Sequence, residues 1–152
     1  TKKEKNYMTE NSLILVDSNI LVYAYDISEK QKRPKALKLI EDCWEGKLKL
    51  CVSVQNLSEF FYVLTNKVQY PLSSTETGER VNAILNSPKW QVFSITKEVI
   101  SEAIALCKRY GINYWNSLIV AVMKRNRISK IYTENTRDFL KVAGIEVINP
   151  LK

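Results

Sequence analysis

The strongest constraint on the fold is an alternation between two hydrophobic periods along the chain. Short, wholly apolar runs, the first at residues 13–16, are separated by segments in which apolar residues recur every three or four positions. Such runs are typical of strands buried on both faces, and the longer period is typical of helices that pack on a sheet. The sequence therefore predicts an α/β fold around a mainly parallel sheet.

The apolar runs and stripes place the expected elements. Strands are expected at residues 13–16, 48–54, 90–95, 130–133 and 145–148. Helices are expected at residues 28–46, 57–68, 81–85, 97–110 and 118–124, with a turn around 137–141. Thr96 and Asn113 are suited to cap the last two helices, and Gly111 to end the first of these. We expect one domain over residues 13–150 and a flexible N-terminal extension over 1–12, because 152 residues suffice for a single core.

Composition limits the chemistry. The chain has no histidine, which excludes Ser-His-Asp and Cys-His catalysis and His-ligated zinc. Its three cysteines contain no C-x-x-C pair and are expected to be buried thiols. The net charge of +7 favours a polyanionic partner. The longest apolar run, residues 118–123, is too short for a membrane span, and the N-terminus lacks the apolar core of a signal peptide, so a cytoplasmic protein is expected.

Oxygen-bearing side chains follow several of the expected strands. In parallel sheets, ligands bind beyond the carboxyl ends of the strands, so these residues are candidates for one site. They are Asp17, Ser18, Asn19, Ser53, Gln55, Asn56, Glu59, Asn113, Asn116, Thr133, Glu134, Asn135, Thr136 and Asp138. Ligands of this kind, without histidine or thiolate, suit Mg²⁺ or Mn²⁺. Four of them also have a structural interpretation: Asp17 as a helix N-cap, Glu59 as a surface carboxylate, Asn116 in a helix first turn, and Asp138 at a turn.

Several segments together resemble the PIN domain family, and in particular its VapC-type toxin ribonucleases. The opening segment Leu13 to Asp26 (LILVDSNILVYAYD) is followed by Ser58-Glu59-Phe60, which resembles the second acidic motif of that family. The third and fourth motifs resemble residues 114–121 (YWNSLIVA) and 131–139 (IYTENTRDF), and residues 144–150 (GIEVINP) resemble the closing strand. The resemblance runs in order over nearly the whole chain.

The resemblance implies a three-layer α/β/α fold and an endoribonuclease that hydrolyses RNA at an acidic Mg²⁺ or Mn²⁺ site. Asp17 would be the central metal ligand, and Glu59 a second ligand or the group that orients the water. Asn116 stands at a further metal-ligand position and Asn135 at a further catalytic one. Supporting roles fall to Asn19 and Thr133, which would hold the carboxylates, and to Asp138.

The resemblance also implies partners, namely RNA, a cognate antitoxin and a second copy of the chain in a homodimer. Two basic strips are candidates to meet the RNA backbone, although solvated surface is an equally plain interpretation. The first strip comprises Lys30, Lys32, Arg33, Lys35 and Lys38, and the second Lys124, Arg125, Arg127 and Lys130.

The sequence departs from the family pattern at two positions, because asparagine replaces aspartate at Asn116 and Asn135. Only Asp17 and Glu59 then supply matched negative charge, which weakens the expected affinity for a divalent ion. A weakened nuclease, a natural inactive PIN domain that binds RNA or protein, and Asp→Asn changes introduced into the chain all remain open. A phosphatase with the same strand-Asp start is disfavoured, because Asn19 replaces the second carboxylate of a D-x-D motif.

Overall fold

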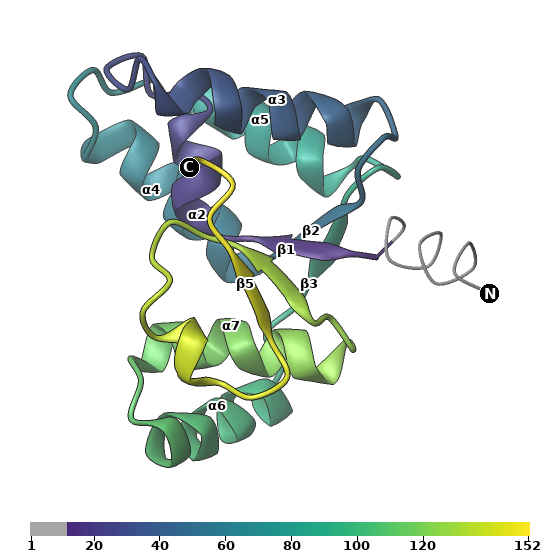
Figure 1. Cartoon of the computed structure of the whole chain (residues 1–152). Coiled ribbons are helices and arrows are strands. Elements are labelled where there is room, and N and C mark those ends of the chain that lie inside the picture. The colour runs from purple at the N-terminus through teal and green to yellow at the C-terminus, as the bar shows by residue number, and fades with distance from the viewer. Residues whose placement is uncertain (1–11) are drawn as a thin grey trace.

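Five short parallel strands form the middle layer of the fold (Figure 1). The computed structural model describes residues 12–152. The strands are β1 (Ile14–Val16), β2 (Leu50–Ser53), β3 (Gln91–Phe93), β4 (Lys130–Tyr132) and β5 (Glu146–Ile148). Their order is β3-β2-β1-β4-β5, and every neighbouring pair is parallel. The predicted parallel α/β sheet is confirmed.

The position of β1 determines where a site can form. The chain builds outward from β1 to β2 and β3, then crosses back to place β4 on the other side of β1. In such sheets the crevice lies at the carboxyl ends of the strands where the order reverses, which here is the end of β1. The register pairs Val16 with Tyr132, so the residues that follow, Asp17 and Thr133, lie at the same level.

Side chains that alternate along each strand divide the interior into two cores. Ile14 and Val16 belong to one core, and Leu15 belongs to the other. Because helices cover both faces of the sheet, the strands β1 and β2 are buried at every position, which explains the apolar runs at these places in the sequence.

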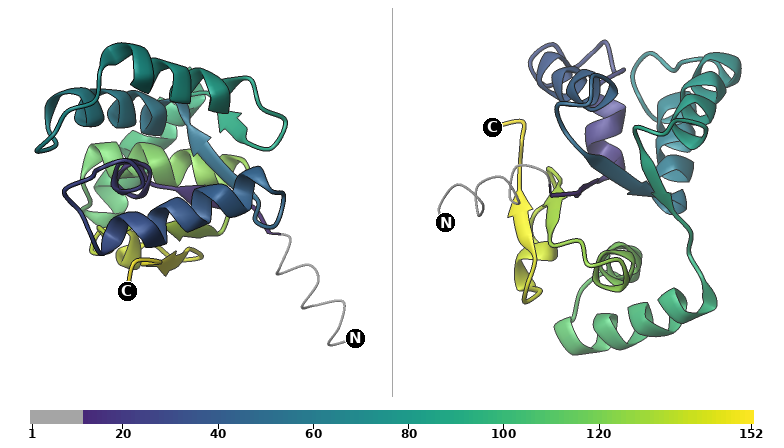
Figure 2. Two further views of the ribbon diagram at one scale, coloured as in Figure 1. Left: turned by 90° about the horizontal axis from the view of Figure 1, so that it is seen from above. Right: turned by 90° about the vertical axis from the view of Figure 1, so that its right-hand side faces the viewer.

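Within residues 12–152, six α-helices cover the two faces of the sheet, which gives the expected three-layer α/β/α arrangement (Figure 2). The first face carries α2 (Ser18–Tyr23), α3 (Lys32–Trp44), α4 (Val54–Asn66) and α5 (Ser74–Leu85). The second carries α6 (Lys97–Tyr110) and α7 (Tyr114–Arg125), and a 3₁₀ turn, η1 (Phe139–Lys141), follows β4. Thr96, Asn113 and Gly111 cap these last helices as predicted, with Gly111 at φ 64°.

Several helices differ from their expected positions, and α4 begins at Val54, which was expected to end a strand. The helix expected from residue 28 begins at Lys32, and the separate helix α2 starts directly after Asp17. α5 begins at Ser74, several residues before the expected start at 81, because Ser73 Oγ accepts a hydrogen bond from the backbone N–H of Glu76. The proposed extension over residues 1–12 lies, apart from Ser12, outside the described residues. Within residues 12–152, no helix combines the length and apolarity that a bilayer crossing requires.

Candidate active site

Asp17 lies at the carboxyl end of β1 and is almost completely buried. Its Oδ1 accepts a hydrogen bond of 2.8 Å from the backbone N–H of Ser18, which makes Asp17 the N-cap of α2. Its Oδ2 accepts a bond of 2.8 Å from the Thr133 hydroxyl, which follows β4. The interpretation of Asp17 as a helix N-cap is therefore correct, and capping occupies only one of its two carboxylate oxygens.

Glu59 is brought next to Asp17 by α4. This helix starts directly after β2, where Ser53 and Asn56 form a reciprocal capping box. Ser18 Oγ donates to Glu59 Oε2 at 2.8 Å, while the Ser18 backbone binds Asp17. Ser18 thus links the carboxylate of Asp17, at the end of β1, to the carboxylate of Glu59, on α4.

In the described part of the chain, the charge of this pair has no basic partner. Burial is the largest cause that raises the pKa of Asp17, and the negative charge of Glu59 raises it further. The hydrogen bonds from Thr133 and Ser18 lower that pKa but do not reverse the change. Within residues 12–152, the ion pairs of Lys and Arg involve other carboxylates. Two adjacent carboxylates held by neutral donors favour a cation between them.

Gln55 extends the site toward α7. Its Nε2 donates to Glu59 Oε1 at 2.8 Å and to the carbonyl of Trp115 at 3.2 Å. Its Oε1 is buried and has no hydrogen-bond partner. A buried acceptor without a partner is unfavourable unless water or an ion satisfies it.

Asn116 contacts Asp138 instead of the Asp17–Glu59 pair. Asn116 Nδ2 donates to Asp138 Oδ2 at 2.9 Å, and the backbone N–H of Asn113 donates to the same oxygen at 3.0 Å. The Asn116 bond is the main cause that lowers the pKa of Asp138, and the Asn113 N–H also lowers it. Asp138 therefore carries its charge at the N-terminus of α7, where the helix dipole stabilises an anion.

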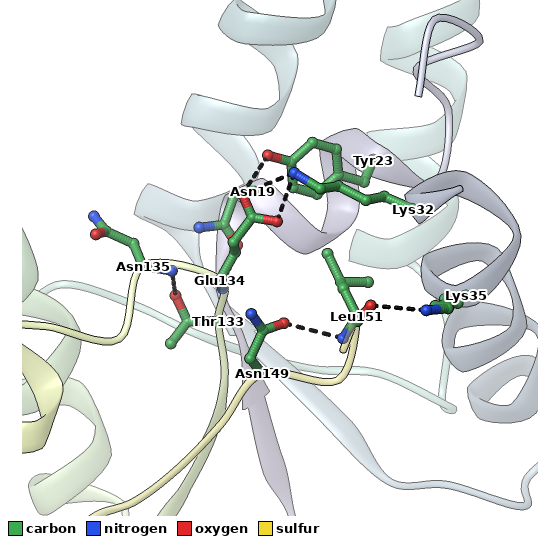
Figure 3. Close-up of polar contacts among 9 residues, drawn as sticks. All are labelled: Asn19, Tyr23, Lys32, Lys35, Thr133, Glu134, Asn135, Asn149 and Leu151. Carbon is green, nitrogen blue, oxygen red and sulfur yellow. Dashed lines mark hydrogen bonds and ion pairs between the residues drawn. The ribbon is translucent and has the colours of Figure 1, made fainter. Parts of the chain in front are cut away.

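The loop after β4 supports the site mainly through its backbone (Figure 3). Thr133 Oγ1, which donates to Asp17, accepts a bond of 3.0 Å from the backbone N–H of Asn135. The Asn135 side chain is exposed and points away from Glu134. Asn19 Oδ1 accepts a bond of 3.4 Å from the Glu134 backbone N–H, so Asn19 holds this loop and not a carboxylate.

Glu134, another acidic residue on this loop, forms an ion pair with a lysine. Its Oε1 accepts a bond of 2.7 Å from the Tyr23 hydroxyl, and its Oε2 lies 3.0 Å from Lys32 Nζ (Figure 3). Burial, followed by the bond to Glu134, raises the pKa of Tyr23. This cluster borders a pocket of about 360 Å³, which is lined by Lys32, Glu134, Thr136, Asn149, Leu151 and Lys152.

The two basic strips differ in their relation to the site. Lys32 of the first strip borders the loop after β4, and Lys35 lies nearby, where it donates to the Leu151 carbonyl at 3.0 Å (Figure 3). The second strip lies at the opposite end of α7, roughly 18 Å from the N-terminus of that 12-residue helix. There Arg125 pairs with Glu102, so this strip has a structural role and does not border the site.

The donor set is compatible with Mg²⁺ or Mn²⁺, although it is small. Within residues 12–152, no three His, Cys, Asp or Glu side chains gather as a complete ligand set. Mg²⁺ is commonly held by one or two carboxylates, with waters and substrate phosphate completing its coordination. Asp17 and Glu59 meet that minimum, and the unpartnered Gln55 Oε1 provides an acceptor for a coordinated water. Hard oxygen ligands of this kind suit these two ions.

The sequence places Ser18 and Gln55 among the polar residues that follow the expected strands, but it assigns neither of them a role in the site. Ser18 lies between the motif residues Asp17 and Asn19. Gln55 lies four positions before Glu59, a spacing that places both side chains on one face of a helix. That spacing was the available signal for Gln55.

Comparisons with known proteins agree with this architecture. The sequence model of the PIN domain family matches residues 14–145. No curated protein sequence matches the chain significantly. Among solved structures, a toxin-antitoxin complex from Klebsiella pneumoniae is 20% identical, with a TM-score of 0.64 and coverage of 90% of this chain and 97% of that one.

Two further structures show the same fold. The VapC20 toxin of Mycobacterium tuberculosis, described as cleaving the sarcin-ricin loop, is 18% identical, with a TM-score of 0.67 and coverage of 88% and 96%. The DNA-bound VapBC complex of Salmonella typhimurium is 14% identical, with a TM-score of 0.62 and coverage of 91% and 97%. The sequence match covers most of the chain, and the parallel sheet, its order and its helical layers accord with it. The chain belongs to the PIN domain family.

Proposed function

We propose that this chain is a VapC-type toxin, a metal-dependent endoribonuclease that hydrolyses RNA phosphodiesters. The observation that carries the proposal is the pair Asp17–Glu59, linked by Ser18 and without a basic partner among the described residues. The pair lies at the carboxyl end of the central strand, where ligands of such sheets bind. The toxin-antitoxin proteins with the same fold support the assignment.

The residues have distinct roles in this proposal. Asp17 and Glu59 hold Mg²⁺ or Mn²⁺, with Asn116 at a third position. A bound ion of this kind polarises a phosphodiester and lowers the pKa of a bound water. Thr133 and Ser18 orient the two carboxylates through their hydroxyls. Asn135 acts through its backbone on Thr133, and Asp138 acts through its bond to Asn116.

The proposal includes the partners RNA and a cognate antitoxin, a homodimer and a cytoplasmic location. The pocket beside Lys32 offers a positive edge for the RNA backbone. Several proteins of this fold were solved as toxin-antitoxin complexes, which supports an antitoxin partner. For the homodimer, Tyr62 on α4 offers an exposed aromatic side chain.

A second candidate function is an inactive PIN domain that binds RNA or protein without cleavage. It is favoured by the amide groups of Asn116 and Asn135 at acidic positions of the family, and by the two-carboxylate donor set within the described residues. This module would bind RNA equally well with and without a divalent ion.

The test is cleavage of end-labelled single-stranded RNA in Mn²⁺ and in EDTA. We expect cleavage only with metal, and a loss of about 100-fold or more for Asp17→Asn. Asp26→Asn is the matched control, because Asp26 is also buried and accepts hydrogen bonds from a serine, Ser28, two positions later in the sequence. Asp26 lines a pocket beside Ser18 and Asn19, but these hydrogen bonds do not join it to the Asp17–Glu59 pair. The double variant Asn116→Asp/Asn135→Asp runs alongside. If neither the parent nor this double variant cuts RNA, the nuclease proposal is wrong and the binding module is favoured.

A further inference from the structure

Trp115 is the most exposed of the aromatic rings in the described part of the chain, with 60% of its surface accessible. It is the second residue of α7 and directly precedes Asn116. A tryptophan buries a large area when it finds a partner, so exposing one is unusual unless the ring contacts something else. The other two tryptophans, Trp44 and Trp90, pack against each other with ring centroids 6.3 Å apart.

The backbone of Trp115 is fixed to the candidate active site. Its N–H donates to Asn113 Oδ1 at 2.8 Å in the cap of α7. Its carbonyl accepts from Gln55 Nε2, the same group that donates to Glu59. The ring lies in an edge contact with Tyr114, with centroids 5.4 Å apart, and Tyr114 packs against the core. A flat apolar surface is thus held in place one residue from Asn116.

We propose that Trp115 is the stacking platform for a nucleobase that flanks the scissile phosphate of single-stranded RNA. Unpaired bases stack on aromatic side chains, and this contact contributes about 1–3 kcal/mol per base without requiring a particular sequence. In a helix, neighbouring side chains point about 100° apart, so Trp115 flanks the site and does not enter it. The inference rests on the proposed nuclease function and names the group that positions its substrate.

The surroundings of Trp115 favour a base over a protein partner. Its neighbours on the helix start, Asn113 and Asn116, are polar and already hydrogen-bonded. Protein contacts generally require a contiguous apolar patch, whereas one fixed ring beside polar groups is sufficient for a base. The chain also carries a net charge of +7, which suits a polyanion.

The test measures binding of a 12-nucleotide single-stranded RNA in EDTA, where cleavage does not interfere. We expect Trp115→Ala to weaken binding about tenfold and Trp115→Phe to weaken it threefold or less, because phenylalanine keeps a ring. Tyr70→Ala is the control, since Tyr70 is similarly exposed. With an abasic oligonucleotide, wild type and Trp115→Ala should bind equally. Thermal melts by circular dichroism verify that each variant folds.

A second measurement separates positioning from chemistry. The variant Trp44→Phe leaves Trp115 as the exposed tryptophan, because Trp90 is buried. Binding of the RNA should quench the fluorescence of Trp115 in this variant. In Mn²⁺, Trp115→Ala should raise KM about tenfold and change kcat little.

Equal RNA affinity of wild type, Trp115→Ala and Trp115→Phe would overturn the inference while leaving the nuclease proposal intact. The inference is also overturned if Trp115→Ala loses only dimerisation or antitoxin binding. A wild-type chain that binds RNA neither in EDTA nor in Mn²⁺, and does not cleave it in Mn²⁺, overturns both proposals.

Discussion

Asn116 and Asp138, which lie 22 residues apart, share a hydrogen bond of 2.9 Å between Asn116 Nδ2 and Asp138 Oδ2. The residue at the family's third acidic position therefore donates a hydrogen bond to a carboxylate further along the chain. The bond lowers the pKa of Asp138 and turns the Asn116 amide N–H toward it. An aspartate at position 116 would face Asp138 as a second negative charge.

Asn116→Asp should therefore destabilise the chain in EDTA at neutral pH. The variant replaces a charge-assisted hydrogen bond by repulsion between two carboxylates, a loss of about 2 kcal/mol in the free energy of unfolding. Urea unfolding measures this loss, and added Mn²⁺ should recover part of it by binding the new charge. Asn135→Asp is the control, since its exposed side chain should change stability by about 0.5 kcal/mol or less. Equal stability of both variants would contradict the Asn116–Asp138 contact.

Thr133→Val should affect both the stability and the acid limb of the pH–rate profile. It removes the hydroxyl that donates to buried Asp17 Oδ2 at 2.8 Å, a loss of about 1–3 kcal/mol. Because that bond lowers the pKa of Asp17, its removal should raise this pKa further. The acid limb should then shift to higher pH, whereas Thr133→Ser, which keeps the hydroxyl, should leave it in place. An unshifted limb in Thr133→Val would show that Asp17 does not govern it.

Asp17→Asn should stabilise the fold at neutral pH while it abolishes activity. Burial is the largest cause that raises the folded-state pKa of Asp17 above its value in the unfolded chain. The protonated carboxyl group therefore stabilises the fold fully below the unfolded-state pKa, and this contribution is lost as the pH rises through the folded-state pKa. At pH 7 the charged form is thus unfavourable, and the variant should gain about 1 kcal/mol in free energy of unfolding. The extra free energy of unfolding of Asp17→Asn, relative to wild type, should shrink as the pH falls through the folded-state pKa of Asp17. A variant that is less stable at pH 7 would contradict this electrostatic description.

Ser18→Ala tests the link between the two carboxylates. The hydroxyl donates to Glu59 at 2.8 Å, so its loss should lower stability by about 1 kcal/mol and activity by about tenfold. Ser28→Ala is a matched variant, because Ser28 Oγ donates to Asp26 at 2.6 Å and not to Asp17 or Glu59, although Ser28 lines the same pocket as Ser18. It should lose similar stability with unchanged RNA cleavage. Equal activity of the two variants would remove Ser18 from the site.

The parallel sheet was predictable because its signal is local. Apolar runs such as residues 13–16 define buried strands, and caps such as Thr96 and Gly111 define helix ends, without reference to distant residues. The start of α2 was available from the sequence through the interpretation of Asp17 as a helix N-cap. The start of α3 at Lys32 was missed because the charged segment before it has no apolar period.

The partners of the charged side chains were not predictable, since they depend on contacts between distant segments. Nothing local indicates that Lys32 and Tyr23 bind Glu134 across more than 100 residues. The same holds for Asp138, which contacts Asn116, and for Gln55, which joins Glu59 to α7. The ordered motifs predicted which residues belong to the site, and the three-dimensional contacts assigned their hydrogen-bond partners.

Calorimetric titration of Mn²⁺ at neutral pH, without RNA, tests the central claim most directly. If Asp17 and Glu59 form a site for a divalent cation, wild type should bind about one ion, and Asp17→Asn and Glu59→Gln should each weaken binding at least tenfold. Asp26→Asn should bind as wild type does, because its carboxylate lies outside the pair. Equal Mn²⁺ binding by wild type, Asp17→Asn and Glu59→Gln, or none in wild type, would contradict the account.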